Sequence, residues 1–158
     1  MHLFTIGVYG STADEFFKKL TDNRIDTFCD VRHRRAVRGS QYAFANSQRL
    51  QDRLEQQGIK YLHFPELAPS QEMIKMQDEA DHEHHIRRRD RAELSPEFVK
   101  EYKKQCLHNF DAGEFIEKLG SDAKNVVLFC VEKTPEACHR TLLAEKISSG
   151  KKLKVTHL

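Results

Sequence analysis

The sequence lacks the features that would place this chain in a membrane or in an oxidising compartment. No apolar run approaches the ~18 residues that a membrane-spanning helix needs, so we expect no membrane partner. The four cysteines stand at irregular spacing without a Cys-x-x-Cys pair, which predicts reduced thiols and no disulfide framework. The opening Met1-His2-Leu3-Phe4 lacks a basic region followed by a long apolar one, so no secretory signal is expected. These absences together predict a cytoplasmic protein.

A large excess of charge of one sign is also missing. The formal net charge is +2 at pH 7, although 32% of the residues are charged. This balance argues against a uniformly basic nucleic-acid binder, but it allows a local basic patch because the arginines are clustered. The hydrophobic content of 39% can build a core, and a chain of 158 residues corresponds to one domain. We therefore expect residues 1–158 to form a single domain.

Apolar segments of strand length alternate with amphipathic segments of helix length in the first part of the chain. The predicted elements are strands at 3–6, 25–31 and 59–64, and helices beginning near Thr12 and near Asn46 or Ser47. Strands that alternate with helices pair in parallel through right-handed crossovers. The order therefore predicts an α/β fold, a three-layer domain with a mostly parallel sheet.

The alternation stops at residues 68–94, a polar and highly charged segment that we interpret as a peripheral helical insertion. Helices are expected again from Ser95 and Asp111. Within the insertion, His82 and His85 have the i, i+3 spacing of two metal ligands on one helix face. No further ligand follows at the expected spacing, so a solvated helix is favoured and no metal is predicted.

The most informative segment is 126–140. Residues 126–131 are apolar and rich in valine, which predicts a strand buried on both faces. A helix start follows, and it places Cys138, His139 and Arg140 in the opening turns of a helix after the carboxyl end of that strand. Open α/β sheets bind their ligands at this edge. The segment therefore predicts a functional site.

The residue types in this segment suggest their roles. A cysteine in the first turn of a helix, near cations, has a lowered thiol pKa and becomes a nucleophile. Cys138 and His139 are therefore candidate catalytic residues, and the alternative is that Cys138 packs as a small apolar residue. Glu132 is a candidate acid, base or orienting carboxylate. Arg140 is a candidate anion ligand, unless an ion pair with Glu132 uses it to hold the loop.

A second polar group follows the predicted strand at 25–31. If that strand is parallel to 126–131, Asp30 and Arg32 open on the same edge as Glu132 and Cys138. We therefore predict Asp30 as a catalytic residue and Arg32 as an anion ligand. The arginines that follow, up to position 38, are solvated in one interpretation and contact phosphate in the other.

The end of the first strand supplies two further candidates. Gly7 and Tyr9 are predicted to bind ligand, because glycines at 7 and 10 would let a ligand approach the end of the strand. An ordinary tight turn is the alternative interpretation of these glycines.

Three of these segments also carry a resemblance to a known family. They are Thr5-Ile6-Gly7, Asp30-Val31-Arg32 and the pattern Cys-x-Glu-Lys-x-Pro-x-x-Cys-His-Arg at 130–140. Together they resemble the domain of unknown function family 488, and the resemblance spans nearly the whole chain. It supports the fold and the location of the site. The activity of that family is not established, so the resemblance implies no reaction, substrate or cofactor.

The sequence thus predicts a protein that binds a phosphorylated or nucleotide-like small molecule at the carboxyl edge of its sheet, with or without chemical conversion. Whether it is an enzyme is left open. The alternative is a nucleic-acid-binding module that uses arginine clusters at 32–38 and 87–91. A partner-binding protein without chemistry is a third interpretation. An enzyme needs a concave pocket lined by Asp30, Glu132 and Cys138, whereas a nucleic-acid binder needs a continuous basic face.

Overall fold

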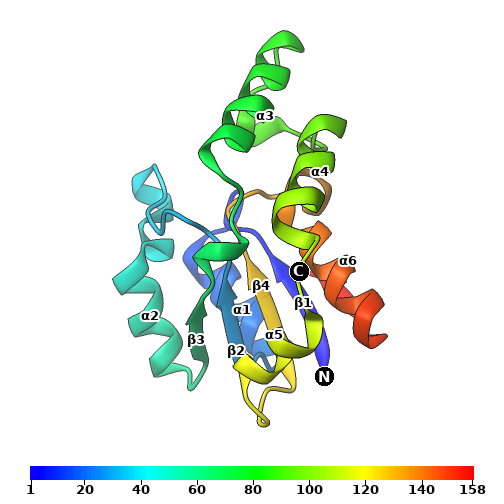
Figure 1. Ribbon diagram of the computed structural model, residues 1–158. Coiled ribbons are helices and arrows are strands. Elements are labelled where there is room, and N and C mark those ends of the chain that lie inside the picture. The colour runs from blue at the N-terminus through cyan, green and yellow to red at the C-terminus, as the bar shows by residue number, and fades with distance from the viewer.

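The computed structural model describes residues 1–158 apart from the side chain of Arg89. Its centre is a five-stranded sheet with the order β3-β2-β4-β1-β5 (Figure 1). All neighbouring strands in it are parallel. The strands are β1 (His2–Ile6), β2 (Thr27–Asp30), β3 (Lys60–His63), β4 (Asn125–Phe129) and β5 (Val155–His157). The predicted α/β fold with a parallel sheet is therefore confirmed.

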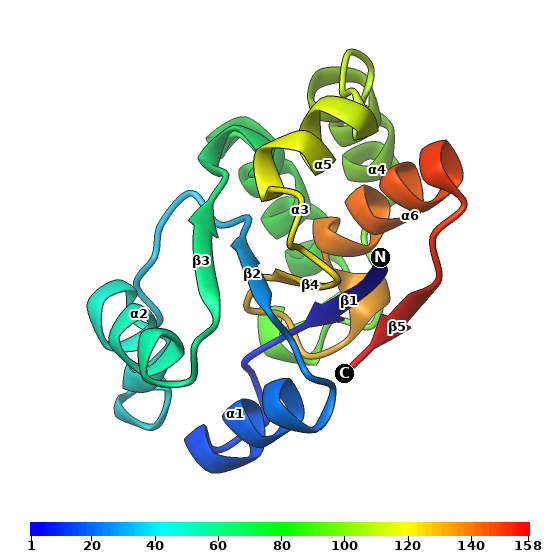
Figure 2. The ribbon, with the colours of Figure 1, turned by 90° about the horizontal axis from the view of Figure 1, so that it is seen from below.

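Helices cover both faces of the sheet, which gives three layers (Figure 2). One face is covered by α1 (Ala13–Asp22) and α2 (Ser47–Gln56), and the other by α4 (Pro96–Tyr102), α5 (Ala112–Leu119) and α6 (His139–Lys151). Beyond the carboxyl ends of the strands stands α3 (Gln71–Glu83) (Figure 1). The shorter helical segments are η1 (Ser40–Ala45), η2 (Pro65–Leu67), η3 (Arg88–Asp90), η4 (Lys103–Leu107) and η5 (Pro135–Ala137). Among the described residues, no helix has the length and apolar character needed to cross a membrane.

The central strand β4 shows why the sheet could be predicted. Successive side chains of a strand point to opposite faces. Val126 and Leu128 pack in the core with α4, α5 and α6, whereas Val127 and Phe129 pack in the core with α1 and α2. Both faces are buried, so the strand is continuously apolar.

The loops after β2 and β4 leave the same edge of the sheet and run to opposite faces. Residues 31–46 lead from β2 to α2, and residues 130–138 lead from β4 to α6. The register places Asp30 opposite Phe129, so both loops begin at the same level. Neighbouring parallel strands whose connections diverge in this way leave a crevice between the loops. The parallel pairing on which the predicted site depends is therefore present.

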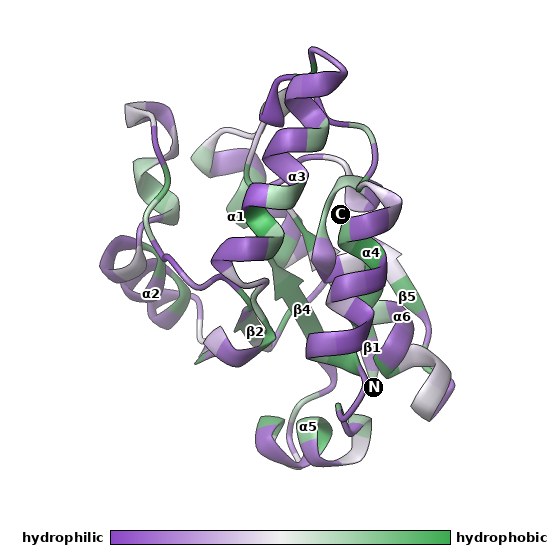
Figure 3. Cartoon of the chain, turned by 45° about the horizontal axis from the view of Figure 1, so that its top comes forward, coloured by the Kyte–Doolittle hydropathy of each residue, from purple (hydrophilic) through white to green (hydrophobic). Residues whose placement is uncertain are grey.

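The polar segment 68–94 contains α3, most of whose residues are hydrophilic (Figure 3). It is nevertheless tied to the rest of the protein. Met73 is buried in the core shared with α4 and α6. Arg91 forms a buried ion pair with Asp81 at 2.6 Å, and the side-chain oxygen of Gln77 accepts from the Ser95 amide at 2.8 Å. These contacts hold α3 above the carboxyl edge of the sheet.

Candidate functional site

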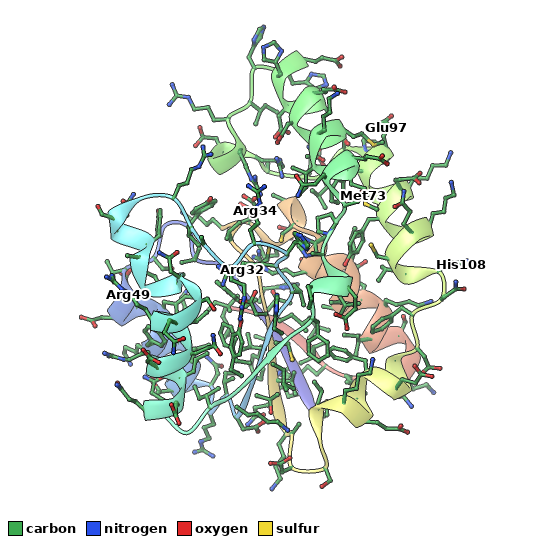
Figure 4. The ribbon with its side chains drawn as sticks, turned by 60° about the vertical axis from the view of Figure 1, so that its left-hand side comes forward. Arg32, Arg34, Arg49, Met73, Glu97 and His108 are labelled. Atoms are coloured by element: carbon green, nitrogen blue, oxygen red, sulfur yellow. The ribbon has the colours of Figure 1, made fainter. Side chains whose placement is uncertain are left out.

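A cleft of about 730 Å³ lies at the carboxyl edge of the sheet. It is lined by the loop after β2, by the loop after β4, by α3 and by residues 88–98. In Figure 4, the labelled Arg32 and Arg34 lie between α2, which carries Arg49, and α3, which carries Met73. The volume is within the range of small-molecule binding sites. The crevice expected from the strand topology is therefore large enough for a ligand.

The structure brings most of the predicted site residues to this cleft. Those that line it are Tyr9, Arg32, Glu132, Cys138 and His139. The other three predicted residues, Asp30, Gly7 and Arg140, are buried and are not part of the lining.

Asp30 does not face the cleft, because its carboxylate is paired inside the fold. Arg32 donates from Nε and Nη2 to the two carboxylate oxygens at 2.8 and 2.7 Å, and the Tyr61 hydroxyl donates to Oδ2 at 2.8 Å. Asp30 is 0% exposed and Arg32 is 4% exposed. The Arg32 guanidinium also lies 4.4 Å from the ring centre of Phe129. Burial and the charge of Asp30 raise the pKa of Tyr61 to about 12. In this arrangement Asp30 orients Arg32.

Arg140 is 1% exposed and is bound by backbone carbonyls. Its Nη1 donates to the Glu132 carbonyl at 2.7 Å, and its Nη2 donates to the Lys133 carbonyl at 3.2 Å. The Glu132 carboxylate instead accepts from Arg88 Nε at 3.0 Å. Arg140 therefore holds the loop, as one interpretation of the sequence proposed, but it does so through the backbone of Glu132. A Cβ at Gly7 would collide with the same Glu132 carbonyl, so glycine there permits close approach of this loop.

Cys138 is the N-cap residue of α6 and not a member of its first turn as the sequence predicts. The reason is η5, a short 3-10 turn that separates Thr134 from the helix. Burial alone would raise the pKa of the Cys138 thiol. A hydrogen bond from Cys130, the positive charge of Arg140 and the electrostatic contact with the His139 side chain together outweigh burial and lower that pKa well below its usual value. Cys130 donates this hydrogen bond and is itself buried, and both effects raise the pKa of its thiol.

Cys130 is a residue of the site that sequence reasoning missed. The apolar run predicts that Cys130 lies within a strand at 126–131, but β4 ends at Phe129 and Cys130 is the first residue beyond it. Its Sγ lies 4.0 Å from His139 Nδ1, and Cys138 Sγ lies 3.8 Å from the same nitrogen. The sequence signal that would have found it is two cysteines on either side of a strand-to-helix loop.

The walls of the cleft carry more positive than negative side chains. Its arginines are Arg32, Arg34, Arg38, Arg88 and Arg91, and its acids are Asp78 and Glu132. Both predicted arginine clusters therefore contribute, although the side chain of Arg89 lies outside the described residues. The Arg34 side chain is exposed and has no hydrogen bond or ion pair to another described side chain or backbone group. Arg34 is therefore available to a bound anion.

These features define a three-layer α/β protein with a thiol- and arginine-lined cleft at the carboxyl edge of a parallel sheet. A family model described as Domain of unknown function DUF488 matches residues 12–147, and the chain belongs to this family. No curated protein and no solved structure matches the chain. The description of the family names no activity, so a function must be inferred from the geometry.

Proposed function

We propose that the protein binds a phosphorylated or nucleotide-like small molecule in this cleft. The observation that carries the proposal is the excess of arginine in a cleft of small-molecule size. Guanidinium groups donate two parallel hydrogen bonds to phosphate oxygens and keep their charge at any physiological pH.

The lining residues suggest which part of such a molecule contacts each part of the cleft. Among the described residues, Arg34 has no partner to give up before it contacts an anion. An apolar part of the wall, formed by Val37, Ile74, Leu94 and Phe98, suits a base or another uncharged part of the ligand. Ligand sites commonly combine a mostly apolar lining with a few placed polar groups.

Cys138 supports chemical conversion in addition to binding. Cys138 is one of the residues that line the cleft, its thiol has a lowered pKa, and a thiolate is the nucleophilic form of cysteine. Glu132 also lines the cleft, and burial and the negative charge of Cys138 raise the pKa of its carboxyl group, so this group can hold a proton above the usual pH range. Cys138, His139 and Glu132 are therefore the proposed catalytic candidates.

Arg34→Gln is expected to weaken binding of phosphorylated ligands about tenfold or more, because one charge-assisted hydrogen-bonding group is lost. A thermal-shift screen with inorganic phosphate, nucleotides and sugar phosphates at fixed ionic strength first identifies a ligand of the unmodified protein. Titration of both proteins with that ligand then measures the change in Kd. The free protein should melt at nearly the same temperature, because Arg34 is exposed.

Arg49→Gln is the matched control, since Arg49 is an exposed arginine on α2 outside the cleft lining (Figure 4). It should leave Kd unchanged. The proposal fails if no phosphorylated compound raises the melting temperature, or if both substitutions weaken binding equally.

The convergence of arginines from 32–38 and 87–91 on one cleft favours nucleic-acid binding as a second candidate. Such binding weakens steeply between about 50 and 200 mM salt, because each neutralised phosphate releases counterions. Fluorescence anisotropy with short single-stranded DNA and RNA measures the slope of log affinity against log salt. Arg34→Gln should reduce that slope by about 1 if Arg34 contacts a phosphate. Absence of binding at low salt would exclude this candidate.

A further inference from the structure

Three potential metal ligands meet at the cleft wall where the loop after β4 closes on the start of α6. Cys130 Sγ, Cys138 Sγ and His139 Nδ1 all lie within 4.8 Å of one another. All three residues are buried, yet all three line the cleft. The fold brings them together because Cys130 directly follows β4, while Cys138 and His139 begin α6.

The hydrogen bond of His139 selects the nitrogen that faces the two sulfur atoms. Its Nε2 lies 3.1 Å from the Val31 carbonyl oxygen. A carbonyl oxygen can only accept, so Nε2 carries a proton, and in the neutral ring Nδ1 keeps its lone pair. A histidine whose one nitrogen donates to a backbone carbonyl while the other faces soft ligands has the arrangement typical of metal-binding histidines.

The distances are close to those of a tetrahedral zinc centre. With Zn–S of about 2.3 Å and Zn–N of about 2.0–2.1 Å, a tetrahedral site separates sulfur from nitrogen by roughly 3.5 Å. The observed separations of Nδ1 from the two sulfur atoms are 3.8 and 4.0 Å. The two nitrogen–sulfur separations therefore need to shorten by only a few tenths of an ångström, and the two sulfur atoms lie within 4.8 Å of each other.

We propose that Cys130, Cys138 and His139 bind a Zn²⁺ ion whose fourth coordination position opens to the cleft. Two thiolates and one imidazole form a ligand set that zinc accepts, and three protein ligands with one open position distinguish catalytic from structural zinc sites. Zinc is coordinated by thiolate, so binding releases into solvent any thiol protons that Cys130 and Cys138 carry. When the ion is bound, the Cys138 sulfur is a zinc ligand and no longer a free nucleophile. The open coordination position of the zinc then faces the cleft.

The zinc proposal does not depend on the proposed binding of a phosphorylated ligand, because all three atoms that would bind zinc belong to the protein. Cobalt(II) tests it in the reduced, chelator-treated full-length protein, since cobalt bound by thiolate absorbs in the near ultraviolet. We expect one ion per chain, with bands that disappear when Zn²⁺ is added. Competition with a coloured chelator then gives the zinc affinity.

Substitution of each ligand has its own expected signature. Cys130→Ser and Cys138→Ser should each remove about half of the thiolate absorption. Each should weaken zinc binding about 100-fold or more, because loss of a direct ligand costs at least as much as loss of an outer-shell partner. His139→Gln should keep the sulfur bands and weaken binding at least about tenfold. Cys106→Ser is the matched control, because Cys106 lies on a different helical segment outside the cleft lining, and it should change neither property.

A second measurement uses the unmodified protein and so does not depend on whether a variant folds. Zinc should slow the alkylation of Cys130 and Cys138 near neutral pH, relative to the metal-free protein, and should leave the alkylation of Cys106 unchanged. The proposal is overturned if the reduced protein forms no cobalt–thiolate bands, or if zinc protects Cys106 as much as Cys138. Phosphate binding by the metal-free protein tests the proposed function separately.

Discussion

Asp30→Asn is expected to reduce the free energy of unfolding by about 3–5 kcal/mol, the cost of breaking a buried ion pair by removing one partner. The substitution leaves the Arg32 charge 4% exposed without the carboxylate that now accepts from it at 2.7 and 2.8 Å. The remaining contacts of Arg32, with the Ala45 carbonyl and the ring of Phe129, carry no negative charge. Because Arg32 lines the cleft, its displacement in this variant should also change ligand binding.

Denaturation by urea, followed by circular dichroism, measures this loss. Asp22→Asn is the matched control, because it breaks the exposed pair between Lys18 and Asp22, whose side chains are 72% and 57% exposed. Exposed pairs contribute less than about 1 kcal/mol. Equal losses for the two variants would mean that the Arg32 charge reaches water, and the wall of the cleft would then be built differently from the structure described above.

The fold was predictable because its signals are local. The apolar run of β4 is buried on both faces, as its composition predicts. Thr12 and Glu15 have the spacing of a capping box, and the structure shows both of its hydrogen bonds. Parallel pairing then followed from the alternation of strands and helices. Boundaries were less certain, and the end of β4 at Phe129 matters most because it leaves Cys130 outside the strand.

The partners of the charged residues were less predictable. Asp30 and Arg32 are two positions apart and so lie on one side of an extended chain, a local signal that could have indicated their contact. Arg88 and Glu132 are 44 residues apart, and their pairing depends on where α3 and η3 pack in the folded protein. The position of a loop relative to a helix is set by tertiary packing, which no spacing in the sequence encodes.

For Arg140, the sequence alone leaves the effect of substitution on stability open, and the structure decides it. From its place near a helix N-terminus, where a cation is disfavoured, the anion-ligand interpretation of the sequence predicts that Arg140→Ala leaves the unliganded protein nearly as stable or slightly more so, whereas the interpretation in which Arg140 holds the loop predicts a loss of several kcal/mol. The structure favours the second outcome, because the guanidinium is 1% exposed and donates to the carbonyls of Glu132 and Lys133. These bonds close the loop that carries Cys130 and Glu132.

Arg140→Ala should therefore lose about 3–5 kcal/mol of unfolding free energy, with or without phosphate. Each hydrogen bond from a charged donor contributes about 1.5–3 kcal/mol, and a cavity adds to the cost. Urea denaturation at fixed ionic strength, in the presence and absence of phosphate, measures both conditions. Arg49→Ala, at an exposed arginine of α2, should change stability by no more than about 0.5 kcal/mol. A small loss for Arg140→Ala combined with abolished stabilisation by phosphate would instead make Arg140 an anion ligand, because only a bound anion would then depend on its charge.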